Sequence, residues 1–164
     1  MTHDAPLSDL FSSHRLSHTP PVPAVRPSAL AALRARFPSL LRLAHPDSGA
    51  AIAFGPQTGP GWWALLWVLS EHISAHARAI GIDHTSCSYP AYVQLKQKFG
   101  FLRIVVRPAD GCVRALTHAA GQRSATICEG CGGAGAWRHE AGSCFTLCGF
   151  CYERRLQGWR TDEW

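Results

Sequence analysis

The segment after Pro60 carries apolar residues at three- and four-residue spacing. This spacing gives a helix one apolar side, and Gly59 followed by Pro60 is typical of the point where a helix begins. Trp63 and Trp67 lie on a neighbouring flank. Either the core covers the helix on two sides, or these tryptophans form an exposed patch that meets a partner. The predicted buried stripe comprises Trp62, Leu65, Leu66, Leu69 and Ile73.

From residue 91 to residue 108 the apolar spacing changes to two, which is typical of β-strands. Two alternating runs flank Gly100, and this arrangement predicts an antiparallel hairpin. Like charges across strands repel unless water or an anion relieves them. The polar face is therefore either a basic recognition face or a solvated face that protects an edge strand. The cations on or near this face are Lys96, Lys98, Arg103 and Arg107.

Three further segments complete the predicted architecture. Ser28 is placed to cap a helix that runs to Arg36, and Asp110 to cap another that ends near Gly121 to Ser124. The prolines before Ser28 predict a leader without a fold. We therefore expect an α+β protein with helices packed on a β-hairpin. Its parts are a flexible, disordered leader over 1–28, an α+β core domain over 29–124, and a zinc-ribbon or knuckle segment with a basic tail over 125–164.

Two CxxC pairs near the end of the chain predict a metal site. Sixteen residues separate the pair Cys128 and Cys131 from the pair Cys148 and Cys151. Two such turns bring four thiolates toward one point, as in zinc ribbons and knuckles. We expect structural Zn²⁺, with an iron–sulfur cluster or free thiols as the alternatives.

Other residues near the pairs leave the ligand set open to substitution. His139 and Cys144 lie between the two pairs, and either is close enough in sequence to replace one cysteine. Cys87 and Cys112 lie in a predicted loop and helix, where we expect inert side chains. Four protein ligands leave no open position on the metal, so the predicted zinc stabilises the fold and does not activate water.

Composition sets the remaining bounds. The chain has 164 residues, of which 46% are hydrophobic and 16% charged, so it can bury a core. Its formal net charge of +5 and pI near 9.0 favour an anionic partner. All sixteen cations except Lys96 and Lys98 are arginines, which suits phosphate recognition but also fits a biased composition. The start of the chain lacks a secretory pattern, and the longest apolar run is too short to span a membrane, so we expect a cytoplasmic protein.

Candidate catalytic groups are sparse. His72 and His76 are four residues apart but lack the HExxH arrangement of hydrolytic zinc sites. Asp83 and His84 lie near Ser86 and Cys87, yet nearness in sequence does not align a triad. The chain has neither a GxxxxGK[ST] phosphate loop nor a GxGxxG motif. We therefore expect no enzymatic activity, and a small hydrolase or nuclease remains the alternative.

The order of features resembles a group of small, mostly uncharacterised phage and prophage proteins. These proteins have a GW-containing helix, a VKxKFGxLRxY-type hairpin, a short helix and a CExCGxxG...LCxxC segment. The matching stretches here are RARFPSLL, GWWALLWVLSEHI, VQLKQKFGFLRIVV, ICEGCGGAG and TLCGFC. This chain departs from the group at Phe101, at Val105 and Val106, and in its longer leader. The resemblance implies a mobile-element origin and a zinc site.

These observations predict a non-enzymatic, zinc-binding accessory protein whose partner is a nucleic acid or a host protein. Zinc ribbons serve both kinds of contact. A phage origin makes an inhibitor of a host defence complex, acting through protein contacts, a second version of this role. A structural assembly component is a third, and it needs Trp63 and Trp67 exposed. The expected partner-binding residues are Lys96, Lys98, Arg103 and Arg107 of the hairpin and Arg154, Arg155 and Arg160 of the tail.

Overall fold

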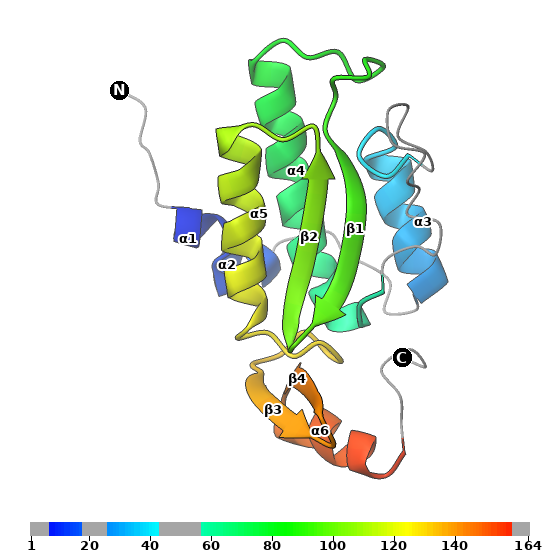
Figure 1. Ribbon diagram of the computed structural model, residues 1–164, viewed down its shortest axis with the longest axis vertical. Helices are drawn as coiled ribbons and strands as arrows, with labels where there is room; N and C mark the ends of the chain where they lie inside the picture. Colours follow the sequence, from blue (N-terminus) through cyan, green and yellow to red (C-terminus); the bar gives the residue numbers. More distant parts are fainter. Residues whose placement is uncertain (1–6, 18–25, 43–56, 159–164) are drawn as a thin grey trace.

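The structure, a computed structural model, describes residues 7–17, 26–42 and 57–158. A long helix, α4, lies behind a β-hairpin, with a second helix beside it and a small cysteine-bearing unit at the lower end (Figure 1). The prediction of a mixed helix and sheet protein is confirmed. The elements are α1 (Leu7–Leu10), α2 (Ser13–Ser17), α3 (Arg26–Arg36), the 3-10 turn η1 (Pro60–Trp62), α4 (Trp63–Ala79), β1 (Ala91–Lys98), β2 (Phe101–Arg107), α5 (Gly111–Ser124), β3 (Ala136–Glu140), β4 (Ser143–Leu147) and α6 (Gly149–Leu156).

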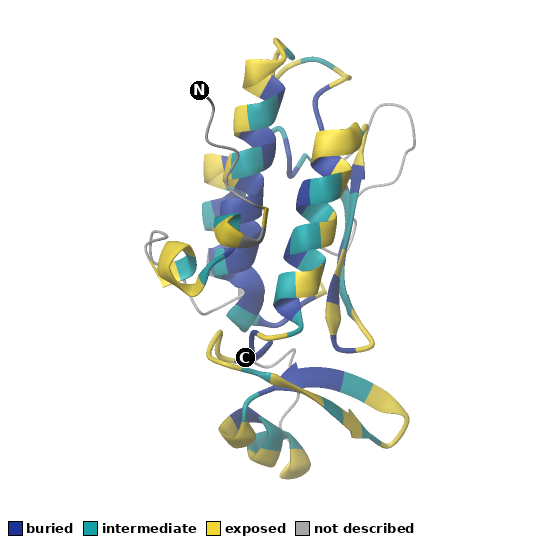
Figure 2. Cartoon of the chain, turned by 90° about the vertical axis from the view of Figure 1, so that its left-hand side faces the viewer, coloured by how far each residue is buried: buried dark blue, intermediate teal, exposed yellow. Residues whose placement is uncertain are grey.

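Helix α4 forms the centre of the hydrophobic core. Its predicted stripe is fully buried, and Trp63 and Trp67 are buried as well, with exposed fractions of 1% and 8%. The Trp67 ring meets the edge of Phe37 at 5.2 Å between centroids, and its Nε1 donates to Glu71 Oε1 at 3.1 Å. The core therefore covers α4 on two sides, and the alternative prediction of an exposed tryptophan patch is wrong. Figure 2 shows the buried residues gathered along this helix. Across the described ranges, no helix has both the length and the apolarity needed to cross a membrane.

Strands β1 and β2 form the predicted antiparallel hairpin, whose inner face covers α4 and α5. Leu95, Leu102 and Val106 are buried on that face. The register pairs Lys96 with Arg103 and Lys98 with Phe101, so these side chains share the outer face. The free edge of β1 is closed, because Gln57 bonds to Leu95 and Gln97, and the Tyr92 amide donates to the Leu40 carbonyl. The sheet thus offers its outer face, rather than the β1 edge, to solvent.

Helix α5 begins where the sequence predicts. The Asp110 side chain accepts a hydrogen bond from the Val113 amide at 2.8 Å and so caps the helix. Its Oδ2 also lies 2.6 Å from His76 Nε2, which ties the start of α5 to the end of α4. At the other end, Ser124 Oγ accepts from the Leu102 amide at 2.9 Å. Helix α5 is therefore fixed to both α4 and the hairpin.

The start of the chain differs from the expected leader. Residues 7–17 contain α1 and α2, and Phe11 between them is 1% exposed. Arg123 on α5 donates to the Phe11 carbonyl at 2.9 Å and to Ser13 Oγ at 2.7 Å. Phe11, with Leu10 and Leu16 packed on the core beside it, and the hydrogen bonds from Arg123 place this segment, although its sequence shows little periodicity. Residues 1–6 and 18–25 lie outside the described residues, and α3 begins at Arg26, ahead of the predicted cap at Ser28.

The turn that starts α4 packs directly on the first cysteine turn. The Gly61 amide donates to the Glu129 carbonyl at 2.7 Å, and Trp62 Nε1 donates to the Ile127 carbonyl at 2.9 Å. A Cβ atom on Gly61 would lie 2.0 Å from the Cys128 carbonyl oxygen, so only glycine permits this approach. The cysteine segment is therefore joined to the core by backbone contact.

A second contact joins the cysteine segment to the tip of the first hairpin. Thr146 Oγ1 donates to the Gly100 carbonyl at 2.6 Å, and the Thr146 carbonyl accepts from the Glu129 amide at 2.8 Å. The Gln97 side-chain amide donates to the Cys144 carbonyl. Thr146 is fully buried here. The cysteine segment thus contacts both layers of the core.

Replacing Gly61 by Ala tests the backbone contact. The added methyl group must push the cysteine turn away from η1, so we expect the free energy of unfolding to fall by about 3 kcal/mol. Urea unfolding of the metal-loaded protein, followed by circular dichroism, measures this. Gly111→Ala is the control, because a Cβ atom there meets open space, and its effect should stay below about 1 kcal/mol. Equal effects of the two substitutions would show that the contact yields to a methyl group.

Candidate metal centre

The two cysteine pairs sit in different local structures. Cys128 and Cys131 lie in a tight turn in which the Gly132 amide donates to the Cys128 carbonyl at 2.9 Å. Cys148 is the N-cap of α6, and the Cys151 amide in the first turn donates to Cys148 Sγ at 3.4 Å. The β3–β4 hairpin connects the two pairs. The second pair therefore comes from the start of a helix.

The four cysteine sulfur atoms converge on one point. All of them lie within 4.8 Å of one another, and Cys131 Sγ is 3.8 Å from Cys148 Sγ. Tetrahedral coordination with metal–sulfur bonds of about 2.3 Å places neighbouring sulfurs ~3.8 Å apart. The four cysteines can therefore bind a single metal ion together.

The remaining cysteines and His139 stand apart from this cluster. Within the described residues, these four cysteines are the one close group of three or more ligating side chains. Cys144 pairs with His139 across the β3–β4 hairpin, while Cys87 and Cys112 are exposed. The expectation that the two CxxC pairs act together agrees with this geometry. Cys87 and Cys112, which we expected to be inert, are both exposed and lie outside the group of four.

The surroundings of the cysteine thiols shift their pKa values in different directions. Burial raises the pKa of Cys128 and also that of Cys151. Burial acts on Cys148 in the same direction, but the Cys151 amide and the neighbouring thiols donate hydrogen bonds that lower its pKa to about 7. Because a metal binds thiolates, the other ligands release protons when the ion enters. The start of α6 thus supplies a ligand, Cys148, that ionises more readily than Cys128 or Cys151.

Glu129, between the first two cysteines, connects the site to the core. Its side chain is buried, and Oε1 accepts from the Gly59 amide at 3.2 Å. Burial raises the pKa of this carboxyl to about 7, against the opposing effects of the Gly59 hydrogen bond and the Arg155 charge. A carboxyl group in this position fixes the orientation of the first cysteine turn relative to η1.

The basic residues of the tail are partly used within the chain. The Arg155 guanidinium lies 3.6 Å from the centre of the Phe145 ring, and its Nε is 3.7 Å from Glu140 Oε2. Arg154 lies over Phe150 at 5.7 Å. Arg160 falls outside the described residues. Arg155 therefore packs α6 onto β4, so its positive charge is not directed at a partner alone.

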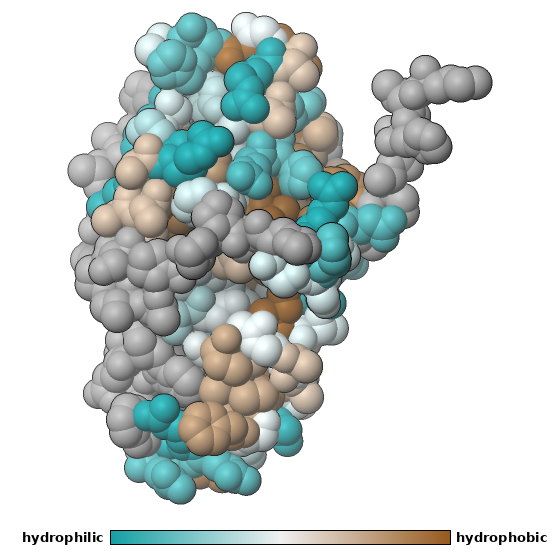
Figure 3. Space-filling view, turned by 180° about the vertical axis from the view of Figure 1, so that it is seen from behind, coloured by the Kyte–Doolittle hydropathy of each residue, from teal (hydrophilic) through white to brown (hydrophobic). Residues whose placement is uncertain are grey.

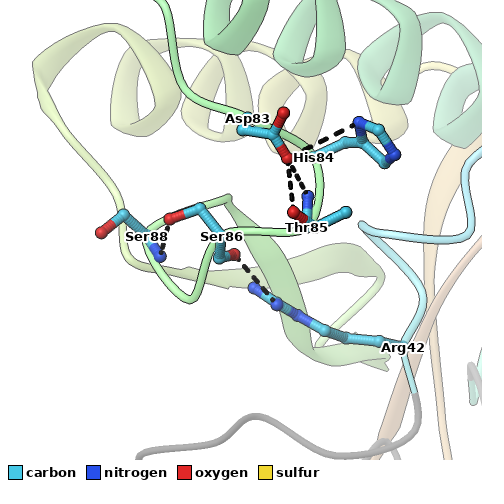
Figure 4. A network of polar contacts seen from close by, with 6 residues as sticks. All are labelled: Arg42, Asp83, His84, Thr85, Ser86 and Ser88. Carbon is cyan, nitrogen blue, oxygen red and sulfur yellow. Dashed lines mark hydrogen bonds and ion pairs between the residues drawn. The ribbon is translucent and has the colours of Figure 1, made fainter.

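The candidate catalytic residues of the loop after α4 serve the loop itself. Asp83 Oδ1 accepts from the Thr85 amide at 2.7 Å and from Thr85 Oγ1 at 2.6 Å, and it lies 3.8 Å from His84 Nδ1 (Figure 4). Ser86 Oγ accepts from the Ser88 amide at 3.0 Å. The pKa of Asp83 is lowered by its two hydrogen bonds with Thr85, and the bond from the Thr85 side chain has the larger effect. No hydrogen bond in the described part of the chain connects His84 to Ser86 or Cys87.

His72 and His76 also have separate partners. His72 meets the edge of the Phe11 ring at 6.2 Å, and burial lowers its pKa, with a smaller contribution from Arg15. His76 contacts Asp110. The two histidines therefore contribute to packing and to the α4–α5 contact, and neither belongs to the metal cluster.

A shallow groove of about 1200 Å³ lies beside the metal centre, between α2, the start of α4 and the cysteine segment. Trp63, Phe150 and Arg154 are among the residues that line it. Seen from behind, apolar atoms gather in the lower part of the molecule, where the cysteine segment lies (Figure 3). The exposed Phe150 side chain thus lies on α6, in the lining of this groove.

Sequence reasoning missed the β3–β4 hairpin and with it Trp137. The available signal was Gly142 between two five-residue runs, whereas Ala141 gave none, because alanine rarely adopts the positive φ of 46° that it has here. Because a CxxC pair lies on either side, the cysteine spacing predicts two turns in this segment and not two strands. Trp137 lies on β3 and is 55% exposed.

No protein-family model, curated protein or solved structure matches this chain. The resemblance to phage and prophage proteins therefore stays a prediction.

Cysteine substitution tests the ligand set. Cys128→Ser and Cys148→Ser each remove one of four sulfurs, so we expect purified protein to lose most of its bound metal and to melt at a lower temperature. Elemental analysis by plasma mass spectrometry gives the metal content, and calorimetry gives the melting temperature. Cys87→Ser is the control and should retain both values. Loss of metal in Cys87→Ser but not in Cys128→Ser would contradict the assignment.

Proposed function

We propose that this protein is a non-enzymatic accessory protein that uses a structural zinc site and a cationic hairpin to bind nucleic acid. For the metal, a set of four thiolates at tetrahedral spacing suits zinc and also a single iron ion. A cluster of several irons would hold its cysteines on separate metal atoms and therefore farther apart. The ligands come from a tight turn and from the start of α6, with the β3–β4 hairpin between them.

The outer face of the β1–β2 hairpin carries the functional part of the proposal. Lys96 pairs directly with Arg103, and Lys98 and Arg107 extend the row in the same two strands. Residues 84–109 contain no Asp or Glu. In the described ranges, no ion pair connects these cations to a carboxylate. Like charges placed directly opposite each other destabilise a hairpin unless water or a bound anion relieves the repulsion, so this face is suited to a phosphate backbone.

Two alternatives receive less support. A hydrolase would need an aligned set of catalytic groups, whereas Asp83 and His76 are hydrogen-bonded within the fold. An assembly component with an exposed tryptophan patch does not fit the burial of Trp63 and Trp67. An acidic host protein would use the same hairpin face as a nucleic acid, and a phage origin would suit either partner.

Binding measured over a range of salt concentrations tests the proposal. In the double variant Lys96→Gln and Arg103→Gln, we expect weaker binding to single-stranded and duplex DNA at low salt. The slope of log K against log salt should become shallower by about 0.7 per lost contact on a single strand. Fluorescence anisotropy with labelled oligonucleotides measures both quantities.

A matched variant separates local contacts from total charge. The double variant Arg78→Gln and Arg114→Gln loses the same charge from the exposed sides of α4 and α5 and should keep the native slope. Absence of binding by the native protein at low salt would refute nucleic-acid recognition and make an acidic protein the next candidate.

A further inference from the structure

The tip of the β1–β2 hairpin contains a residue that the turn does not favour. Phe99 and Gly100 both have positive φ values, of 55° and 85°, as in a type I′ turn. This turn prefers Asn, Asp or Gly at both positions, because a side chain with Cβ is strained there. Phe99 is 66% exposed, so burial does not compensate for the strain. Neither the backbone nor the core accounts for a phenylalanine at this position.

Other exposed rings lie next to Phe99. Phe101 is 44% exposed and shares the outer face of the hairpin with Lys98. Trp137 comes from β3, and its Nε1 donates to the Phe99 carbonyl at 3.2 Å. His139 stacks on the Trp137 ring at 6.1 Å between centroids and 19° between planes. These four residues, Phe99, Phe101, Trp137 and His139, form an aromatic platform where the first hairpin meets the cysteine segment.

The platform gathers most of the exposed aromatic surface. In the described residues, four Phe or Trp side chains are exposed, and three of them belong to the platform; the fourth is Phe150. Gly100 permits this arrangement, since a Cβ atom there would lie 3.0 Å from the Trp137 ring. The fold thus holds Trp137 against the turn while its ring remains in contact with solvent.

Cations border the platform. Lys98 Nζ lies 5.2 Å from the centre of the Phe99 ring, and Arg103 follows Phe101 on the same face of β2. Exposed rings next to a row of cations are the combination that binds single strands, because unpaired bases stack on rings while phosphates contact the cations. In a duplex the bases stack on each other, so their faces are not accessible to such rings.

We propose that the aromatic platform stacks unpaired bases and thereby makes the protein a binder of single-stranded nucleic acid. This inference rests on the proposed function, since the cations of the hairpin hold the phosphates of the same strand. Phe99 and Trp137 provide the principal stacking surfaces. Lys98, which lies between these rings and the other cations of the hairpin, contacts the phosphate backbone of the bound strand.

Two labelled strands of equal length test the proposal in fluorescence anisotropy: an oligothymidylate and an abasic oligodeoxynucleotide, which has the phosphates but no bases. We expect the native, metal-loaded protein to bind the oligothymidylate roughly 5- to 100-fold more tightly per stacked ring. Phe99→Asn should reduce this preference and leave affinity for the abasic strand unchanged. Because Asn suits the turn, the melting temperature of the Phe99→Asn variant should equal or exceed that of the native protein. Phe99→Trp should restore the preference.

Phe150→Asn provides the matched control, because Phe150 is 67% exposed but lies on α6 in the lining of the groove. It should keep the native preference for the oligothymidylate. Equal binding of both strands by the native protein would overturn the stacking proposal while leaving phosphate binding by the cations intact. Binding of neither strand at low salt would refute the proposed function together with it. A native preference that persists both in Phe99→Asn and in the double variant Phe99→Asn with Trp137→Ser, which removes both principal rings, would exclude the platform as its source.

Discussion

The approach of one backbone turn to another holds the two parts of this protein together. Gly61 lies so close to the Cys128 carbonyl oxygen and the Gly132 amide that any side chain would separate the turns. Around this point the Gly61 amide, the Trp62 indole and the Gly59 amide all donate to groups of residues 127–129. Backbone donors buried without partners are unfavourable, so the start of α4 depends on the cysteine turn for its hydrogen bonds. The orientation of the long central helix follows from that turn.

This arrangement joins the candidate metal centre, which has its own small buried cluster, to the main core. Cys128, one of the four residues that would hold the ion, has its carbonyl group against Gly61, and the next residue, Glu129, directs its side chain to Gly59. A ligand that binds only the folded state stabilises every element that folds together with its site. The β1–β2 hairpin belongs to the same unit through Thr146 and Gly100. A metal ion bound at the four cysteines would therefore also stabilise the hairpin that carries the proposed binding face.

Long, regular patterns were predictable from the sequence, and contacts between distant segments were not. The stripe on α4, the period of the β1–β2 hairpin, the Asp110 cap and the convergence of two cysteine pairs all depend on residues close together in the chain. The burial of Trp63 and Trp67 was only one of two alternatives, since it depends on Phe37 and other distant partners. Phe11 was missed because Arg123, far along the chain, fixes its backbone. The position of Trp137 beside Phe99 likewise depends on how two hairpins pack.

The contact between η1 and the cysteine turn also sets an order for events during synthesis. The acceptor of the Trp62 indole, the Ile127 carbonyl, is separated from it by 65 residues. At about 5–20 residues per second, the ribosome needs roughly 3 to 13 seconds to add that stretch. During this interval the nascent chain contains α4 and its tryptophans but not yet the cysteine segment that packs on η1. The last of the four cysteines is added later still. The nascent core thus completes this contact only after residue 127, and the candidate metal site only after Cys151, have been synthesised.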